Sequence, residues 1–115
     1  MKNNETLNRR CLQFLGAKLI ESEDSVYWII YKINGRMYSG DYLEFCTSFL
    51  AMGIILQNKN YRAITKVREI GLSLHSGVWH LTICPEGTGD GYQADNRSLP
   101  KLIALSCDYF LKEGL

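Results

Sequence analysis

The sequence has no hydrophobic run long enough to cross a membrane. A membrane-spanning helix needs about 20 apolar residues, and the longest apolar stretch here covers only residues 49–56. The first residues, Met1 to Glu5, also lack the apolar core of a secretory signal peptide. These absences predict a protein of the cytoplasm that does not engage a membrane.

Paired cysteines are also missing. Cys11, Cys46, Cys84 and Cys107 form no CxxC pair and no close cluster. Structural zinc sites usually take their ligands from close pairs, and free thiols in a reducing compartment pack as small apolar side chains. We therefore expect four packed cysteines, no bound transition metal and no cofactor.

A strong net charge is missing as well. The chain carries 13 Lys and Arg against 12 Asp and Glu, a formal net charge of +1, so nothing draws it generally towards nucleic acid. Basic residues gather locally at Lys59, Arg62, Lys66 and Arg68, while residues 85–96 are acidic. The simplest interpretation of both segments is a solvated surface.

The chain contains enough for one globular domain. Its 115 residues are 46% hydrophobic and 22% charged, and a domain of this size buries roughly two-thirds of the surface of its unfolded chain. No linker, repeat or low-complexity tract divides it. We expect a single domain over residues 1–115.

Helices and hairpins alternate along the sequence. The patterns predict a helix over about 5–15, strands at 17–21, 26–33 and 36–39, a helix near 61–70, strands at 72–76, 78–84 and 92–94, and a helix after Ser98. Asn34-Gly35 and Gly77 mark hairpin turns. Short hairpins favour antiparallel pairing, so we expect an α+β fold, mostly antiparallel sheet with helices packed on it.

Three segments carry more specific expectations. Residues 41–56 suit a helix in their early part, and Gly53 should break it. The strand 26–33 is apolar on both faces, which predicts cover on both sides. In the helix at 61–70, Tyr61, Ile64, Val67 and Arg68 mark the packed stripe, and Gly71 should end it.

The second hairpin has one apolar and one half-polar face. Leu72, Leu74, Trp79, Leu81 and Ile83 share a face if the turn is tight, so we expect Trp79 in the core. The opposite face then carries Ser73, His75, Val78, His80 and Thr82.

Three segments resemble a known family. Residues 63–83, AITKVREIGLSLHSGVWHLTI, give a helix, a glycine and a strand pair centred on tryptophan. Residues 94–111 contain an apolar final helix that starts with Leu-Pro. Residues 6–19 contain a helix followed by a glycine. In the order of these elements and in their hydrophobic pattern, the chain resembles the phage ABA sandwich family. The resemblance implies a three-layer α/β/α sandwich and a phage or prophage setting, and it brings no catalytic residues.

The residues that could carry chemistry are few. His75 and His80 can position a proton or hold a metal, but their hairpin offers no acidic third ligand, and two polar residues on a half-exposed strand are the simpler interpretation. Cys84 lies about 13 Å along the strand from His80, too far for activation. The glycine-rich loop at 87–91 leads into a strand and not a helix, which favours a mobile, dispensable hairpin loop over a phosphate cradle. We therefore expect no catalytic residues.

Aromatic and basic residues interleave on the first hairpin at Tyr27, Tyr31, Lys32, Arg36 and Tyr38. Such residues stack bases in single-stranded nucleic acid or a nucleotide, and they are equally enriched at protein interfaces.

We expect a non-enzymatic phage-type binding protein, an inhibitor of bacterial antiviral defence that binds a host protein or sequesters a small nucleotide-like signal molecule. One alternative is a nucleotide or single-stranded nucleic-acid binder that uses the Tyr/Arg hairpin and the basic helix. The other is a small enzyme using His75 and His80. The expected binding residues are Arg36, Tyr38, Ser73, His75, His80, Arg62 and Lys66. We also expect a homodimer, with the half-polar hairpin face at its two-fold seam and Arg36 and Tyr38 near it.

Overall fold

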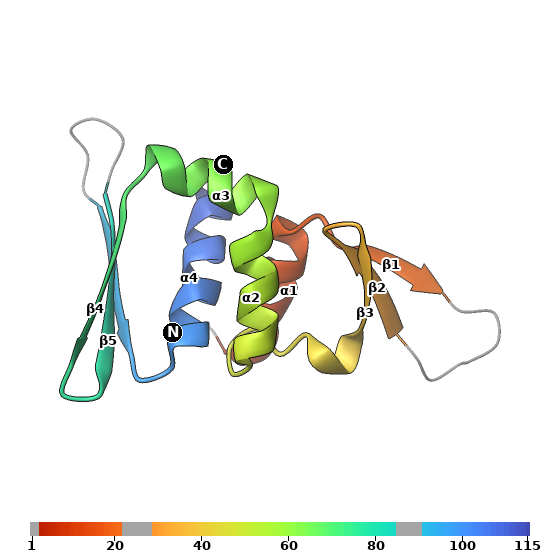
Figure 1. Cartoon of the computed structure of the whole chain (residues 1–115), viewed down its shortest axis with the longest axis horizontal. Helices are drawn as coiled ribbons and strands as arrows, with labels where there is room; N and C mark the ends of the chain where they lie inside the picture. The colour runs from red at the N-terminus through yellow and green to blue at the C-terminus, as the bar shows by residue number, and fades with distance from the viewer. Residues whose placement is uncertain (1–2, 22–28, 85–90) are drawn as a thin grey trace.

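The helices lie in the middle of the molecule, with one small sheet at each end of its long axis (Figure 1). The structure, a computed structural model, describes residues 3–21, 29–84 and 91–115. Its principal extents are 51 × 31 × 22 Å. The helices are α1 (Asn4–Phe14), α2 (Phe49–Gln57), α3 (Lys59–Val67) and α4 (Leu99–Lys112), with a 3₁₀ turn, η1 (Gly40–Tyr42).

Both sheets are three-stranded and antiparallel. Sheet A has the order β1 (Lys18–Glu21), β2 (Ile29–Ile33), β3 (Arg36–Ser39), and sheet B has the order β4 (Ile70–His75), β5 (Val78–Ile83), β6 (Tyr92–Asn96). The expected α+β class with antiparallel pairing is confirmed.

The layer order differs from the α/β/α sandwich that the resemblance implies. Helices separate two sheets here, and they do not cover one central sheet (Figure 1). The cause is α4, whose apolar side chains point in most directions, so that it is buried on nearly all sides. The outer face of sheet B is polar at Ser73, His80 and Asp95, so that sheet needs cover on one side only.

Capping side chains fix the first and last helices where the sequence predicts them. The Asn3 side chain accepts a hydrogen bond from the Thr6 amide at 2.8 Å and begins α1. Gly16 follows that helix with a φ of +64°. Ser98 caps α4, and Gly114 ends it with a φ of +75°.

The expectation that Gly53 breaks a helix is wrong. No helix covers the early part of the segment, because η1 and a turn precede Ser48, whose hydroxyl caps α2 at the Ala51 amide. The helix then runs through Gly53 to Gln57. A glycine costs a helix only about 1 kcal/mol, and burial of Ala51, Ile54 and Ile55 on one side offsets that cost.

The end of α3 also differs from expectation. Gly71 does not end this helix, because the chain leaves helical geometry at Arg68 and Gly71 lies within β4. Val67 was expected in the packed stripe and is 75% exposed, while Tyr61 is buried. Val67, the last residue of α3, therefore faces away from the core.

The structure confirms which side chains of sheet B share a face, but these side chains are not equally buried. Leu72 pairs with Leu81 and Leu74 with Trp79, so these side chains share one face. Leu81 is buried, and Trp79 is half-buried and packed against the core. Leu72 and Leu74 are exposed because β4 is an edge strand.

Within the described residues, sheet A is covered on one face, in contrast to the expected cover on both. Ile33 is buried against the helices, but Lys32 and Met37, which pair on the opposite face, are exposed. Residues 26–28 of the expected strand lie outside the described residues.

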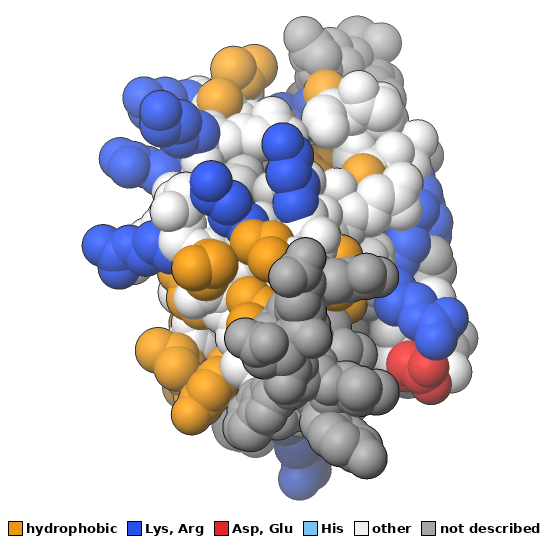
Figure 2. Space-filling model, turned by 90° about the vertical axis from the view of Figure 1, so that its right-hand side faces the viewer, with side chains coloured by type: hydrophobic (Ala, Val, Ile, Leu, Met, Phe, Trp, Pro, Cys, Tyr) orange, Lys and Arg blue, Asp and Glu red, His pale blue; other side chains and the backbone are white. Residues whose placement is uncertain are grey.

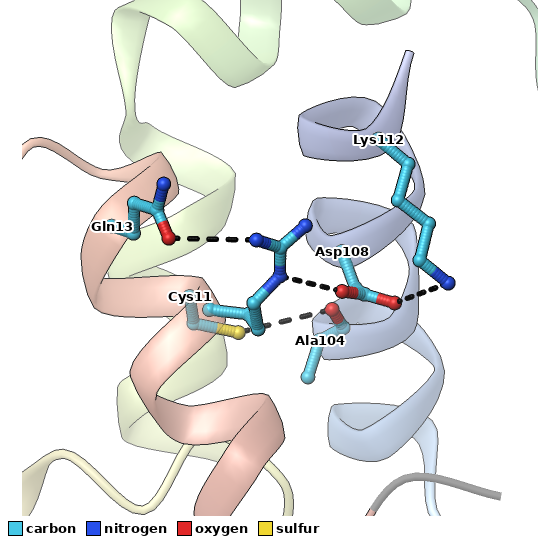
Figure 3. Close-up of polar contacts among 6 residues, drawn as sticks. Cys11, Gln13, Ala104, Asp108 and Lys112 are labelled. Atoms are coloured by element: carbon cyan, nitrogen blue, oxygen red, sulfur yellow. Dashed lines mark hydrogen bonds and ion pairs between the residues drawn. The ribbon is translucent and has the colours of Figure 1, made fainter. Parts of the chain in front are cut away.

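An ion-pair cluster joins the first and last helices (Figure 3). The Asp108 carboxylate, nearly buried on α4, accepts from Arg10 Nε at 2.8 Å and pairs with Lys112 Nζ at 3.3 Å. The Cys11 thiol lies 3.8 Å from the Ala104 carbonyl oxygen. These contacts set the position of α1 on α4.

Three of the four cysteines are packed as expected, and Cys84 is exposed. It directly follows the last residue of β5. Among the helices that the structure describes, none has the length and apolar character needed to cross a bilayer.

Candidate binding surface

The turn between β2 and β3 docks on the junction between α2 and α3. The Asn34 side-chain amide donates to the Ile54 carbonyl at 3.0 Å, and the Asn58 amide donates to Asn34 Oδ1 at 2.9 Å. Asn58 Oδ1 in turn caps α3 by accepting from the Tyr61 amide at 3.0 Å. Asn34 and Gly35 both have positive φ angles, 55° and 77°, which is the geometry of a type I′ turn. One side chain, Asn58, thus starts a helix and holds a hairpin.

This docking brings cations from two distant segments to one side of the molecule. All six are exposed, and we call them the basic surface: Lys18, Lys32 and Arg36 from sheet A, and Lys59, Arg62 and Lys66 from α3. Figure 2 shows Lys and Arg side chains gathered over this side, while the acidic side chains visible among the described residues lie at its edge. Arg62 and Lys66 line one groove with Lys59, and Lys59 lines a second groove with the Asn34-Gly35 turn that precedes Arg36.

Two shallow grooves meet at Lys59. One, of about 500 Å³, is lined by Leu15, Asn34, Gly35, Gln57, Asn58 and Lys59. The other, of about 400 Å³, runs along α3 and is lined by Lys59, Arg62, Ala63, Lys66 and Val67. Since both contain Lys59, they extend from the hairpin turn along the basic helix.

Two lysines face each other across the strands of sheet A. Lys18 and Lys32 are directly paired in the β1–β2 register, and like charges in that relation destabilise a sheet. Met37, the partner of Lys32 on β3, is 68% exposed beside them. An anionic partner would relieve the repulsion between the lysines and cover the methionine.

The tyrosines of this hairpin are only partly exposed. Tyr31 and Tyr38 are paired across β2 and β3, and both are half-buried against the core. Tyr38 therefore supports the sheet more than it offers a binding surface. Tyr27, the third aromatic residue of the pattern, lies outside the described residues.

The half-polar face of sheet B carries a row of three polar residues across its strands. Ser73 pairs with His80, and His80 pairs with Asp95. His80 Nδ1 lies 2.6 Å from Asp95 Oδ1, and the His75 and His80 ring centroids are 5.5 Å apart. The sequence analysis missed Asp95, because the register of β6 on β5 cannot be read across the intervening loop.

This row lies open to water. The side chains of His80 and Asp95 are 37% and 64% exposed, whereas catalytic electrostatics depends on a site from which water is excluded. No group of three or more His, Cys, Asp or Glu suited to a metal ion occurs in the described part of the chain. Asp95 thus orients His80, but the row is not enclosed.

The two sets of expected binding residues lie at opposite ends of the molecule. Arg36 and Tyr38 belong to sheet A, while Ser73, His75 and His80 belong to sheet B, on the far side of the helices (Figure 1). The expectation that Arg36 and Tyr38 lie near the histidine face is therefore wrong within one chain. The proposed phosphate cradle and mobile loop fall mostly on residues 85–90, outside the described residues.

Sequence reasoning also missed the parts of the basic surface that depend on tertiary structure. Lys18 has no distinguishing local pattern and joins the cations of sheet A through its pairing with Lys32, while the docked turn brings sheet A beside the start of α3. The Asn-Gly turn and the Asn58 cap are both visible in the sequence, but their contact is not. No protein-family model, curated protein or solved structure matches the chain.

Proposed function

We propose that the protein is a small non-enzymatic binding protein that holds an acidic surface of another protein against its basic surface. The observation that carries this proposal is the docked β2–β3 turn, which gathers cations of sheet A and α3 on one side. Complementary charge speeds association and orients the partner. The exposed Met37 adds the apolar contact that protein interfaces bury among charges.

The biological setting that we propose follows from the sequence resemblance. A phage or prophage protein of this size would act by stoichiometric binding, and the partner would be a host protein of an antiviral defence system. The support for this setting is the similarity of residues 63–83 and 94–111 to the phage ABA sandwich family.

The alternative ligand for the same cations is a nucleotide or single-stranded nucleic acid. Base recognition relies on exposed aromatic rings, and Tyr31 and Tyr38 are half-buried. This observation favours a protein partner over a nucleic acid. The enzyme alternative has one supporting observation, the 2.6 Å contact between His80 and Asp95, and a loss of turnover in His80→Ala is its test.

The test of the proposed function is capture of a partner with charge-reversed variants. Wild-type protein immobilised on resin should retain a host protein at fixed stoichiometry after nuclease treatment, and the Arg36→Glu, Arg62→Glu double variant should not. The matched control is Arg97→Glu, an exposed arginine beyond β6 at the other end of the molecule. Equal capture by the double variant would refute the proposal. Capture that disappears with nuclease treatment would favour the nucleic-acid alternative.

A further inference from the structure

The helix α2 carries exposed apolar side chains on the side away from the core. Phe49 is 66% exposed, Leu50 is 70% exposed and Leu56 is 42% exposed. The buried side is formed by Ala51, Ile54 and Ile55. A surface helix of a monomer normally has a polar outer side, but α2 contains no charged residue at all. An apolar patch of this kind marks an interaction site.

Gly53 lies at the centre of this exposed side. With 3.6 residues per turn, Phe49, Leu50, Gly53 and Leu56 fall within about a third of the helix circumference, and we call them the apolar face of α2. A Cβ added at Gly53 would meet nothing within 4 Å, and its φ is not in the left-handed region. Neither packing nor backbone geometry within the chain requires a glycine here. A second helix that crosses closely over this point would require one.

We infer that a second copy of the chain docks on the apolar face of α2, with the two α2 helices antiparallel and crossing at Gly53. The face is self-complementary about a two-fold axis through that residue. Large side chains lie on both sides of a small centre, so Leu56 of one copy falls beside Phe49 and Leu50 of the other. Close contact at such a crossing depends on the small size of the central residues.

The charges at the two ends of α2 agree with the antiparallel arrangement. Glu44 is exposed just before the helix, where its carbonyl accepts from the Ser48 amide at 2.9 Å. Lys59 is exposed just after the helix. An antiparallel pair brings Glu44 of each copy towards Lys59 of the other, whereas a parallel pair would bring like charges together.

This dimer differs from the expected one. The histidine face of sheet B was expected at the seam, but its polar row is satisfied by exposure to water and by the His80–Asp95 contact. The apolar face of α2 exposes large apolar side chains to water, and a partner that buries them would gain more stability than one on the histidine face. The inference goes beyond the proposed function, because the apolar face of α2 contains no residue of the basic surface and self-association has its own readout. Lys59 alone belongs to the basic surface and also lies at the end of α2.

Light scattering coupled to size exclusion tests the inference on the full chain. Wild-type protein should show a dimer mass that falls towards the monomer over about a hundredfold dilution. Gly53→Arg should raise the dissociation constant at least about thirtyfold, the effect of a central interface residue. Its circular dichroism and melting should remain those of a folded protein, because the site is open within the chain. Met37→Arg, an equally exposed apolar site on sheet A, should leave the dimer intact.

A charge exchange tests the direction of the helices. Glu44→Lys and Lys59→Glu should each weaken the dimer, and the double variant should restore it. A monomeric wild-type protein, or a Gly53→Arg variant that remains a dimer, would overturn the inference. Binding of monomeric wild type to anionic lipid vesicles, lost in Gly53→Arg, would assign the apolar face to a membrane surface instead. Loss of the dimer in both single variants without rescue would contradict the antiparallel arrangement.

Discussion

The Asp108 carboxylate is buried in the core, where its charged partners offset the cost of removing its charge from water. Arg10 Nε donates to it at 2.8 Å, and the Arg10 side chain is itself only 27% exposed. Asp108→Asn keeps the shape but leaves the Arg10 charge without its carboxylate. We expect a loss of about 2–4 kcal/mol in the free energy of unfolding, measured by urea titration.

Lys112 provides the control for that substitution. It pairs with the same carboxylate at 3.3 Å, but its side chain is 57% exposed. Lys112→Ala should therefore cost less than about 1 kcal/mol. Equal effects of the two substitutions would show that the Arg10 contact does not stabilise the α1–α4 interface.

Cys46 makes the stability sensitive to alkaline pH. Burial, with a contribution from Cys11, raises the pKa of its thiol from 9.0 to about 11. The folded chain then keeps this proton at pH values where the unfolded chain loses it. The resulting stability is complete below about pH 9 and is lost as the pH rises towards 11. Burial raises the pKa of Tyr61 and Cys107 in the same direction.

Urea titrations between pH 8 and pH 10.5 measure this effect. The contribution of Cys46 alone should fall by roughly 1 kcal/mol by pH 10, and Cys46→Ala should reduce the slope. A free energy of unfolding that stays constant over this range would mean that the thiol is not buried as the structure has it.

At the scale of elements, Asn58 links a helix cap to the hairpin contact. Asn58→Ala removes the cap at the Tyr61 amide and the amide donor to Asn34. We expect a loss of about 2 kcal/mol, half from the cap and half from the contact. Chemical denaturation measures the loss, and binding of the captured partner should weaken as the turn loosens.

Asn58→Asp separates the two roles. A carboxylate still caps α3 and suits the positive end of the helix, but it cannot donate to Asn34. The helix should therefore keep its stability while partner binding weakens as it does in the alanine variant. Partner binding equal to wild type would show that the docked turn does not organise the basic surface.

Local signals predicted the elements that depend on local chemistry. The Asn34-Gly35 turn, the Gly77 turn and the start of α4 after Ser98 all depend on residues within a few positions. Gly53 and Gly71 were misjudged because the packing of α2 on α4 and the pairing of β4 with β5 outweigh a glycine's small helix penalty.

The arrangement of the whole molecule depends on contacts that no short pattern contains. The apolar character of α4 on most sides was visible in the sequence and is consistent with its central position, but nothing local placed the two sheets on opposite sides of it. The basic surface has the same origin. Its cations come from residues 18–36 and 59–66, and two asparagine contacts join these segments.

The most direct test of the central claim, that the basic surface binds acidic partners, is an NMR titration of ¹⁵N-labelled protein with polyglutamate, with a single-stranded oligonucleotide in parallel. We predict amide shifts confined to sheet A and α3 around Arg36, Lys59 and Arg62, which disappear in the Arg36→Glu, Arg62→Glu variant. Tighter binding of the oligonucleotide, with shifts at Tyr31 and Tyr38, would contradict the choice of a protein partner. Shifts centred on His75 and His80 of sheet B, or no shifts at all, would contradict the claim itself.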